Sequence, residues 1–414
     1  MTAPATPGGT EVRPVPLRVV VVDHTAELGG AELALVRLCA ALRAAGPASP
    51  PVDVRVLLGA DGPLRVRLAG LGVVVEVLPL DARVRTASRD AVARAGPAQM
   101  RGAALAVAWS WRVARRLRAL RPDVVHTTSL KADLLGLVAA RAARRPLVWH
   151  VHDRVAPDYL PRSLVALVRA AARVPDAVVV NSRATAETLP VPAVVAYPGF
   201  APGQERPARA LPDGVRARGA PVVGIVGRLG PTKGQLELLR AMPAVLAAHP
   251  AARLRVVGEA TFDDPAYGDG LRREAERLGV AHAVDWVGFV PDTATELDGL
   301  DVCVHASPVP EPFGQVVVEA MARGVPVVAT AAGGVLEILA PDDDGAPLGL
   351  LVPPGDHEAL GRAVVDALDD PDAARARARR AHAAALRRFP VARTADVVTA
   401  VWRRVAARGR RPRP

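Results

Sequence analysis

The chain is poor in cysteine and has no long apolar run. Cys39 and Cys303 are the only cysteines among 414 residues, so neither a disulfide framework nor a zinc site is expected, and a reducing compartment is favoured. No uncharged apolar run approaches the roughly 18 residues of a membrane span. The N-terminus lacks the basic and apolar regions of a signal peptide. We therefore expect a cytoplasmic protein.

Lysine is almost absent. Of 53 basic residues only Lys131 and Lys233 are lysines, and the other 51 are arginines. Lys233 lies in a glycine-rich turn within VVGIVGRLGPTKGQLEL. Arginine carries a planar, forked cation, whereas lysine carries a compact charge on a flexible stem, so this choice suggests that the turn needs a point charge. Codon drift at an exposed turn is the alternative.

The net charge of +11 is confined to the first half of the chain. Residues 1–200 hold 26 basic and 15 acidic side chains, whereas residues 201–414 hold 27 of each. The excess predicts an anionic partner for the first half: a phosphate-bearing substrate, an anionic membrane surface or a nucleic acid. Residues 158–173 are apolar and basic enough to lie at a membrane surface, although packing against a sheet would explain them too.

Aromatic residues make up only 3% of the chain, and they are not interleaved with basic residues. Proteins bind single-stranded nucleic acids largely by stacking bases on aromatic rings, so no nucleic-acid partner is expected. Half of the residues are apolar and 23% are charged, which is typical of a globular protein. The length predicts two domains of ordinary size.

Short β-branched apolar runs alternate with helix-like segments in both halves. In the first half the runs are residues 17–23, 52–58, 73–78, 123–126, 146–151 and 177–181. In the second half they are residues 222–226, 253–257, 283–287, 302–305, 325–330 and 349–352. Continuous apolar strands separated by helices predict parallel sheets covered on both faces. We therefore predict an α/β fold with two doubly wound, Rossmann-like domains, whose ligands lie at the carboxyl ends of strands.

Composition also predicts the domain boundaries. Residues 1–16 are expected to be a disordered tail, and residues 17–198 the first domain. Residues 199–219 are rich in proline, glycine and charge, as linkers are. Residues 220–392 are predicted to form the second domain. Residues 393–414 are predicted to form a helix that returns towards the first domain and ends in a basic tail.

Two glycine-rich loops follow strands and precede helices. Gly29 and Gly30 open a helix whose free N–H groups would let an anion approach the backbone. In GRLGPTKG the strand ends at Gly227, and Arg228 and Lys233 would suit two adjacent phosphates. An ordinary helix start and a solvated turn are the respective alternatives.

A third loop carries two carboxylates. Glu311 precedes a helix that is predicted to start near Gly314, and Glu319 lies in its second turn. Carboxylate oxygens accept hydrogen bonds from sugar or ribose hydroxyls, and the N–H groups of Phe313 and Gly314 could face a phosphate. The preference of acidic residues for helix starts would explain Glu311 but does not explain Glu319 among apolar residues.

His152 is the histidine most suited to a site, because it follows a strand and precedes Asp153 in a loop. His126, His24 and Lys131 are weaker candidates for a site, and a surface role at a helix start explains Lys131 equally well. The remaining histidines are assigned to structural or exposed positions: His150, His249, His282, His305, His357 and His382.

Four segments, GRLGPTKG, VGFV, EPFGQVVVEAMARGVPVVATAAGGVLEI and GLLVPPGD, closely resemble the family 4 retaining glycosyltransferases of the GT-B fold. The early GGAE and VWHVHD at residues 148–153 fit the same family, and the resemblance spans nearly the whole chain. The chain departs from it at Tyr197-Pro198-Gly199, where many relatives have Asn-Gly, and this departure concerns the hinge between the domains.

The resemblance implies a donor-binding set and a catalytic set. Glu319 would hold the ribose of a nucleotide-sugar donor, Glu311 the transferred sugar, and His152 would lie near the 6-position of that sugar. The implied donor-binding residues are Gly29, Gly30, Gly227, Arg228, Lys233, Phe313, Gly314, Gln315 and Glu319. The implied catalytic residues are His152, Glu311, Lys233 and Arg228. Residues 17–198 would bind the acceptor, with His24, His126 and Lys131 on the acceptor side.

The resemblance further implies transfer to a saccharide or a polyprenyl-phosphate-linked acceptor, in the synthesis of glycans or cell-envelope polysaccharides. Retention of configuration is expected. Neither a metal nor a cofactor is expected, because two cationic side chains would stabilise the charge of the leaving diphosphate. The acidic strings at 342–344 and 370–372 are interpreted as loop and helix-boundary residues. An association with the inner face of the cell membrane would match the basic first half.

Two alternatives remain open from the sequence. The chain could be a non-catalytic subunit that binds a nucleotide sugar and scaffolds a polysaccharide assembly complex. It could also be another GT-B enzyme, such as a nucleotide-sugar epimerase or a phosphorylase. All the residues that sugar transfer requires are present, and this favours the glycosyltransferase over both alternatives.

Overall fold

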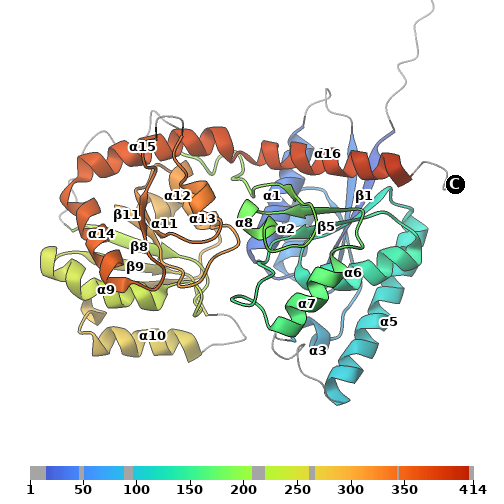
Figure 1. Ribbon diagram of the computed structural model, residues 1–414, viewed down its shortest axis with the longest axis horizontal. Coiled ribbons are helices and arrows are strands. Elements are labelled where there is room, and N and C mark those ends of the chain that lie inside the picture. The colour runs from blue at the N-terminus through green and yellow to red at the C-terminus, as the bar shows by residue number, and fades with distance from the viewer. Residues whose placement is uncertain are drawn as a thin grey trace, which may run out of the picture.

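The computed structural model describes residues 15–45, 51–87, 97–207, 220–260, 266–342 and 345–409. Most of the predicted tail, most of the predicted linker and the basic end at 410–414 lie outside the described residues. The described chain forms two α/β units, each built on one parallel sheet, and Figure 1 shows them side by side.

The first sheet has seven parallel strands in the order β3-β2-β1-β4-β5-β6-β7. Its strands are β1 (Leu17–Asp23), β2 (Val52–Leu58), β3 (Val74–Val77), β4 (Val124–Thr127), β5 (Leu147–Val151), β6 (Ala177–Val180) and β7 (Val194–Val195). The strand order reverses between β1 and β4, and such a switch point opens a crevice at the carboxyl ends of the two strands.

The second sheet has six parallel strands in the order β10-β9-β8-β11-β12-β13. Its strands are β8 (Val222–Val226), β9 (Arg253–Val257), β10 (Val284–Gly288), β11 (Val302–His305), β12 (Val327–Thr330) and β13 (Leu350–Val352). Here the switch point lies between β8 and β11. The loops after these two strands carry Arg228, Lys233 and Glu311.

Helices cover both faces of each sheet because the strands are apolar on both sides. Around the first sheet lie α1 (Gly30–Ala44), α2 (Pro63–Gly70), α3 (Ala82–Arg85), α5 (Pro97–Leu120), α6 (Leu130–Ala143), α7 (Arg162–Ala171) and α8 (Arg183–Ala186). Around the second lie α9 (Gln235–Ala248), α10 (Ala266–Arg277), the short η2 (Ala281–Ala283), α11 (Ala294–Asp298), α12 (Gln315–Ala322), α13 (Val335–Ile338), α14 (His357–Asp369) and α15 (Pro371–Arg388).

The last helix, α16 (Val391–Gly409), crosses from the second unit to the first. Figure 1 shows α15 above the second sheet and α16 above the first. Val398 and Trp402 of α16 are fully buried in the same apolar cluster as Leu35 of α1. The chain leaves the first unit near Gly199 and returns to it near Val391. These two segments are in close contact, since a Cβ atom on Gly199 would lie 2.5 Å from the backbone nitrogen of Val391.

All twelve strands expected from the sequence are present, and those at 17–23, 52–58, 222–226, 253–257 and 302–305 have the expected bounds. The sequence did not reveal β7, because a two-residue strand has no periodicity to detect. None of the described helices is long and apolar enough to cross a membrane.

Candidate active site

The two units contact one another through loops that follow their strands. Ser182 of the first unit donates a hydrogen bond to the carbonyl oxygen of Pro312, at 2.5 Å. The first two backbone N–H groups of α8 donate to the carboxylate of Glu337, at 2.9 and 2.7 Å. The first unit therefore packs directly against the loop that carries Glu311.

Glu311 is the centre of a charged cluster in the second unit. One carboxylate oxygen accepts from the ammonium of Lys233, and the other contacts Nε2 of His305 at the end of β11. The Glu311 side chain is 14% exposed. Burial alone would raise the pKa of Glu311, but Lys233 and His305 outweigh burial and hold this pKa well below its usual range. The cluster thus presents an ionised carboxylate at neutral pH.

The loop between β8 and α9 needs glycine at both ends. Gly227 has a φ of +149° and Gly234 a φ of +82°. A Cβ atom on Gly234 would lie 2.1 Å from the carbonyl oxygen of Ala306, so the loop packs tightly on the end of β11. Arg228 is exposed, and its guanidinium has no partner among the described residues. This cation is available to an anionic ligand.

Helix α12 begins at a glycine with a positive φ, Gly314 at +110°. The ring of Phe313 is buried and stacks on Tyr197, with centroids 5.8 Å apart, so only the backbone of Phe313 can meet a ligand. Gln315 is the first helical residue, and its Nε2 has no partner within the described chain. Glu319 lies one turn further on, is 13% exposed and pairs with an arginine of α1.

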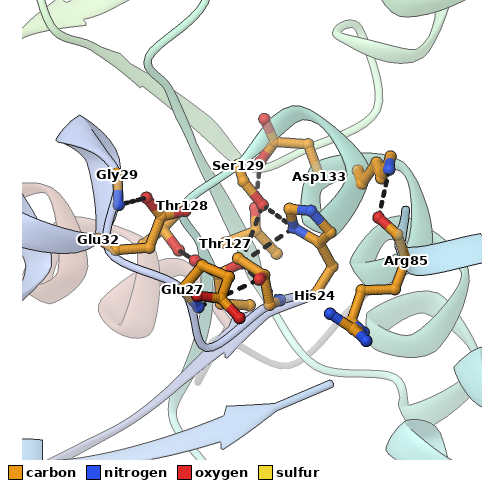
Figure 2. A network of polar contacts seen from close by, with 12 residues as sticks. His24, Glu27, Gly29, Glu32, Arg85, Thr127, Thr128, Ser129 and Asp133 are labelled. Carbon is orange, nitrogen blue, oxygen red and sulfur yellow. Dashed lines mark hydrogen bonds and ion pairs between the residues drawn. The ribbon is translucent and has the colours of Figure 1, made fainter. Parts of the chain in front are cut away.

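At the start of α1 there is free space beside Gly30, whereas the backbone N–H of Gly29 is already hydrogen-bonded. No atom lies within 4 Å of the place that a Cβ atom on Gly30 would occupy. The N–H of Gly29 donates to the carboxyl of Glu32, at 3.0 Å (Figure 2). Burial and the charge of Asp23 raise the pKa of Glu32 from 4.5 to about 8. Glu32 is therefore largely uncharged at neutral pH and does not repel an anion from this helix start.

Glu32→Gln is expected to change the pH dependence of stability. With a folded pKa of about 8 and an unfolded pKa of 4.5, Glu32 takes up a proton on folding between these pH values. Its contribution to stability is complete below pH 4.5 and is lost as the pH rises through 8, at up to about 1.4 kcal/mol per pH unit. The amide has no such dependence. Urea unfolding from pH 5 to 9 should therefore show a shallower decline in Glu32→Gln than in the wild type, and parallel curves would contradict the prediction.

The ring of His152 lies against that of His150, with ring centroids 4.1 Å apart and the ring planes tilted by 34°. Its carbonyl oxygen accepts from Asn181 at 3.0 Å, which fixes the loop after β5. Burial lowers the pKa of His152 from 6.5 to about 4, although the charges of Asp153 and Asp23 oppose this shift. A neutral imidazole can both donate to and accept from a sugar hydroxyl.

His126 was expected on the acceptor side, but it is fully buried in β4. Its Nδ1 accepts a hydrogen bond from Nε1 of Trp402, at 3.1 Å, so α16 covers it. Burial, with the charge of His152, lowers the pKa of His126 to about 3. His126, His150 and His152 all line one small pocket, which also includes Leu35 and Leu38 of α1.

His24 and Lys131 lie at the switch point of the first sheet. Nδ1 of His24 is 2.7 Å from the hydroxyl of Ser129, a contact drawn in Figure 2, and 3.1 Å from the carboxylate of Asp23. Its side chain is 16% exposed, so part of the ring is open to the crevice. Lys131 donates to the carbonyl oxygen of Arg85 at 2.6 Å, so it anchors α3.

Three residues of the site went unrecognised in the sequence. His305 was assigned a structural or exposed position, yet it contacts Glu311; its place at the carboxyl end of a strand could have identified it. Glu32 ends the GGAE motif at the start of α1 but was given no role, and Arg37 lies further along this helix and carries no local signal. Only the packing of the fold shows what they contact.

Residues 29–198 match the family model described as glycosyl transferase 4-like domain, and residues 212–384 the one described as glycosyl transferases group 1. The lipopolysaccharide core biosynthesis mannosyltransferase LpcC of Rhizobium leguminosarum bv. viciae is 30% identical over 292 residues, or 65% of this chain and 82% of that protein. The chain belongs to the family 4 glycosyltransferases. The prediction from its motifs is confirmed.

A second relative of this glycosyltransferase is the GDP-mannose-dependent alpha-mannosyltransferase of Mycobacterium tuberculosis. It is 32% identical over 268 residues, which cover 60% of this chain and 65% of that protein. The crystal structure of Anabaena HepE in complex with UDP and glucose is 27% identical, with a TM-score of 0.77 over 94% of this chain and 100% of that one. The GT-B fold predicted from the sequence is confirmed.

Proposed function

We propose that this glycosyltransferase moves a hexose from a nucleoside-diphosphate sugar to a saccharide or lipid-linked acceptor, with retention of configuration and without a metal ion. HepE was crystallised with UDP-glucose, and the Mycobacterium tuberculosis relative is named for GDP-mannose. Both names support a nucleotide-sugar donor. LpcC is named for lipopolysaccharide core biosynthesis, which supports an acceptor in the cell envelope.

The observation that carries this proposal is the cluster at the switch point of the second sheet. An ionised Glu311 is held by Lys233 and His305, and in the adjoining loop the guanidinium of Arg228 has no partner among the described residues. A carboxylate can orient sugar hydroxyls, and two cations can meet a diphosphate. A nucleotide-sugar donor contains both a sugar and a diphosphate, so it matches this arrangement.

Cleavage of the sugar–phosphate bond leaves positive charge on the sugar and additional negative charge on the departing diphosphate. Arg228 and Lys233 would stabilise that diphosphate, since fixed charges act most strongly where charge develops. The departing phosphate oxygen would take the proton of the acceptor hydroxyl as that hydroxyl attacks the same face of the sugar. The neutral His152 would orient the sugar from the first domain, and Glu319 would hold the ribose. Two cations supply the charge neutralisation, so no metal is required in this scheme.

We place the acceptor on the first domain, which carries the whole excess of positive charge. Its helices α5 and α7 expose large apolar side chains: Met100 is 75%, Trp111 50% and Leu167 51% exposed. Arginines accompany them, and the guanidinium of Arg118 lies 5.9 Å from the Trp111 ring. Exposed apolar and cationic groups on one domain are typical of proteins that bind anionic membranes, where a lipid-linked acceptor would lie.

A panel of UDP-, GDP- and ADP-hexoses tests the proposed function. One nucleotide sugar should be hydrolysed slowly without acceptor, at the same rate with and without EDTA, and NMR should show the donor's anomeric configuration in the product. Binding of a nucleotide sugar without any turnover would favour the scaffold, and turnover that EDTA abolishes would contradict metal independence.

In the same preparation, the protein should sediment with phosphatidylglycerol vesicles and not with phosphatidylcholine vesicles.

A further inference from the structure

A charged contact joins the first domain to the carboxylate proposed to bind the nucleotide ribose. Nη2 of Arg37, on α1, lies 2.5 Å from Oε1 of Glu319, on α12. The two side chains are only 9% and 13% exposed. Nη1 of Arg37 also donates to the carbonyl oxygen of Gly199, at 3.4 Å, where the chain crosses between the domains. One guanidinium therefore contacts α12 and the interdomain crossing while it is itself anchored in α1.

The position of Arg37 on α1 is informative. Arg37 follows Gly30 by seven residues, which is close to two helical turns, so both lie on the same face of α1. That face offers the open helix start at one end and Arg37 about 10 Å further along. A nucleoside diphosphate extends over a similar length from its phosphates to its ribose. The face of α1 thus runs parallel to the expected donor.

The hydrogen bonds of Glu319 leave room for a ligand. Oε1 accepts from Arg37, and Oε2 accepts from the hydroxyl of Thr293 at 3.3 Å. Each carboxylate oxygen can accept about two hydrogen bonds, so with respect to the described residues each retains one free position. Two free positions on one carboxylate suit two neighbouring hydroxyls, as the ribose 2′- and 3′-hydroxyls are. Arg37 need not leave when the nucleotide binds.

We propose that Arg37 is a positioning residue: from the first domain it holds Glu319 in the orientation that binds the ribose hydroxyls, and so ties nucleotide binding to the docking of the two domains. This inference rests on the proposed role of Glu319 in ribose binding. It concerns the ribose alone, because Arg37 contacts neither Glu311 nor Lys233 among the described residues.

Two other roles for Arg37 lead to different results. If the pair only joined the domains, its loss would lower stability and leave the preference for ribose unchanged. If Arg37 instead competed with the ribose for Glu319, its loss would free the carboxylate and tighten nucleotide binding. The positioning role alone predicts weaker binding that depends on the ribose hydroxyls.

The test is a binding cycle in the full-length protein. UDP, GDP and their 2′,3′-dideoxy counterparts are titrated by calorimetry into the wild type and Arg37→Met. A hydrogen bond to a charged group contributes enough for about a 10- to 100-fold loss in affinity for the ribonucleotide in Arg37→Met. The dideoxynucleotide should bind both proteins equally. Arg37→Lys, which retains the charge, should recover part of the lost affinity.

Arg67→Met is the matched control. Arg67 also reaches the second domain from the first, but it donates to the carbonyl oxygen of Pro291, at 3.2 Å, and not to Glu319. Its ribonucleotide affinity should equal that of the wild type. Thermal unfolding shows whether Arg37→Met is folded, and Arg37→Gln, which keeps an amide donor, replaces it in the cycle if it is not.

Three outcomes would overturn the inference. Equal losses for ribonucleotide and dideoxynucleotide would make Arg37 a structural contact, and tighter ribonucleotide binding would make it a competitor. If the wild type bound the ribonucleotide and the dideoxynucleotide with equal affinity, Glu319 would not bind the ribose hydroxyls, and Arg37 could not position it for that purpose. In each of these cases nucleotide-sugar turnover by the wild type, measured separately, still decides the proposed function.

Discussion

Glu311→Gln is expected to lower kcat for sugar transfer by about 10²- to 10³-fold, the range seen when one preorganised electrostatic group is lost from a site. Gln has the size of Glu but lacks the negative charge that holds Lys233 and contacts His305. Both the orientation of the sugar and the placement of the cation should therefore suffer. Steady-state measurement of nucleotide release gives kcat and KM separately.

Glu76→Gln is the control for this variant. Glu76, on β3 of the first sheet, pairs with Arg116 of α5, and within the described part of the chain it makes no contact with the proposed donor site. Its kcat should be that of the wild type. If Glu311→Gln retained full kcat while remaining folded by circular dichroism, the charged cluster would be structural and the mechanism proposed above would be wrong.

Lys233→Met is expected to have an effect of similar size, about 10²- to 10³-fold in kcat, because a cation that faces the leaving diphosphate is removed. It should also move the acid limb of the pH profile of kcat to higher pH. In the wild type, burial raises the pKa of Glu311, and Lys233 is the strongest of the groups that lower it. Without Lys233 the burial effect remains, so Glu311 is protonated at a higher pH.

Lys233→Arg separates the two explanations for the rare lysine. A guanidinium keeps the charge but is a wide, planar group, and the turn is closed tightly by Gly234 against Ala306. Partial recovery of kcat is expected. Full recovery would mean that any cation suffices and that the lysine reflects codon drift. Arg240→Met is the control, since Arg240 lies on α9 just after this turn in an exposed pair with Glu274.

Much of the fold could be predicted from the sequence because its signals are local. Apolar runs such as 17–23 and 222–226 are too short for helices and too continuous for half-exposed strands, so they indicated buried parallel strands. The glycine-rich turns were visible for a similar reason. Gly227 and Gly314 adopt positive φ values that other residues rarely adopt, and glycine marks such positions in any sequence.

The sequence also indicated the donor-side candidates, because these residues follow strands. Arg228, Lys233 and Glu311 come after β8 and β11, and parallel strands carry their carboxyl ends to one edge of the sheet. Their chemical types suggested phosphate and sugar before any contact was known. The direct contact between Lys233 and Glu311 was not foreseen, since 78 residues separate them in the chain.

The sequence by itself determined the two-domain fold, the family, and which loops carry the charged residues. Only the tertiary structure decided the partners of those residues: His305 on Glu311, an uncharged Glu32 beside Gly29, and Arg37 on Glu319 across 282 residues. Strand and turn preferences depend on neighbours in the chain, so a sequence displays them. Burial and the pairing of charges depend on which surfaces meet after folding, and the surfaces that carry Arg37 and Glu319 belong to two different domains.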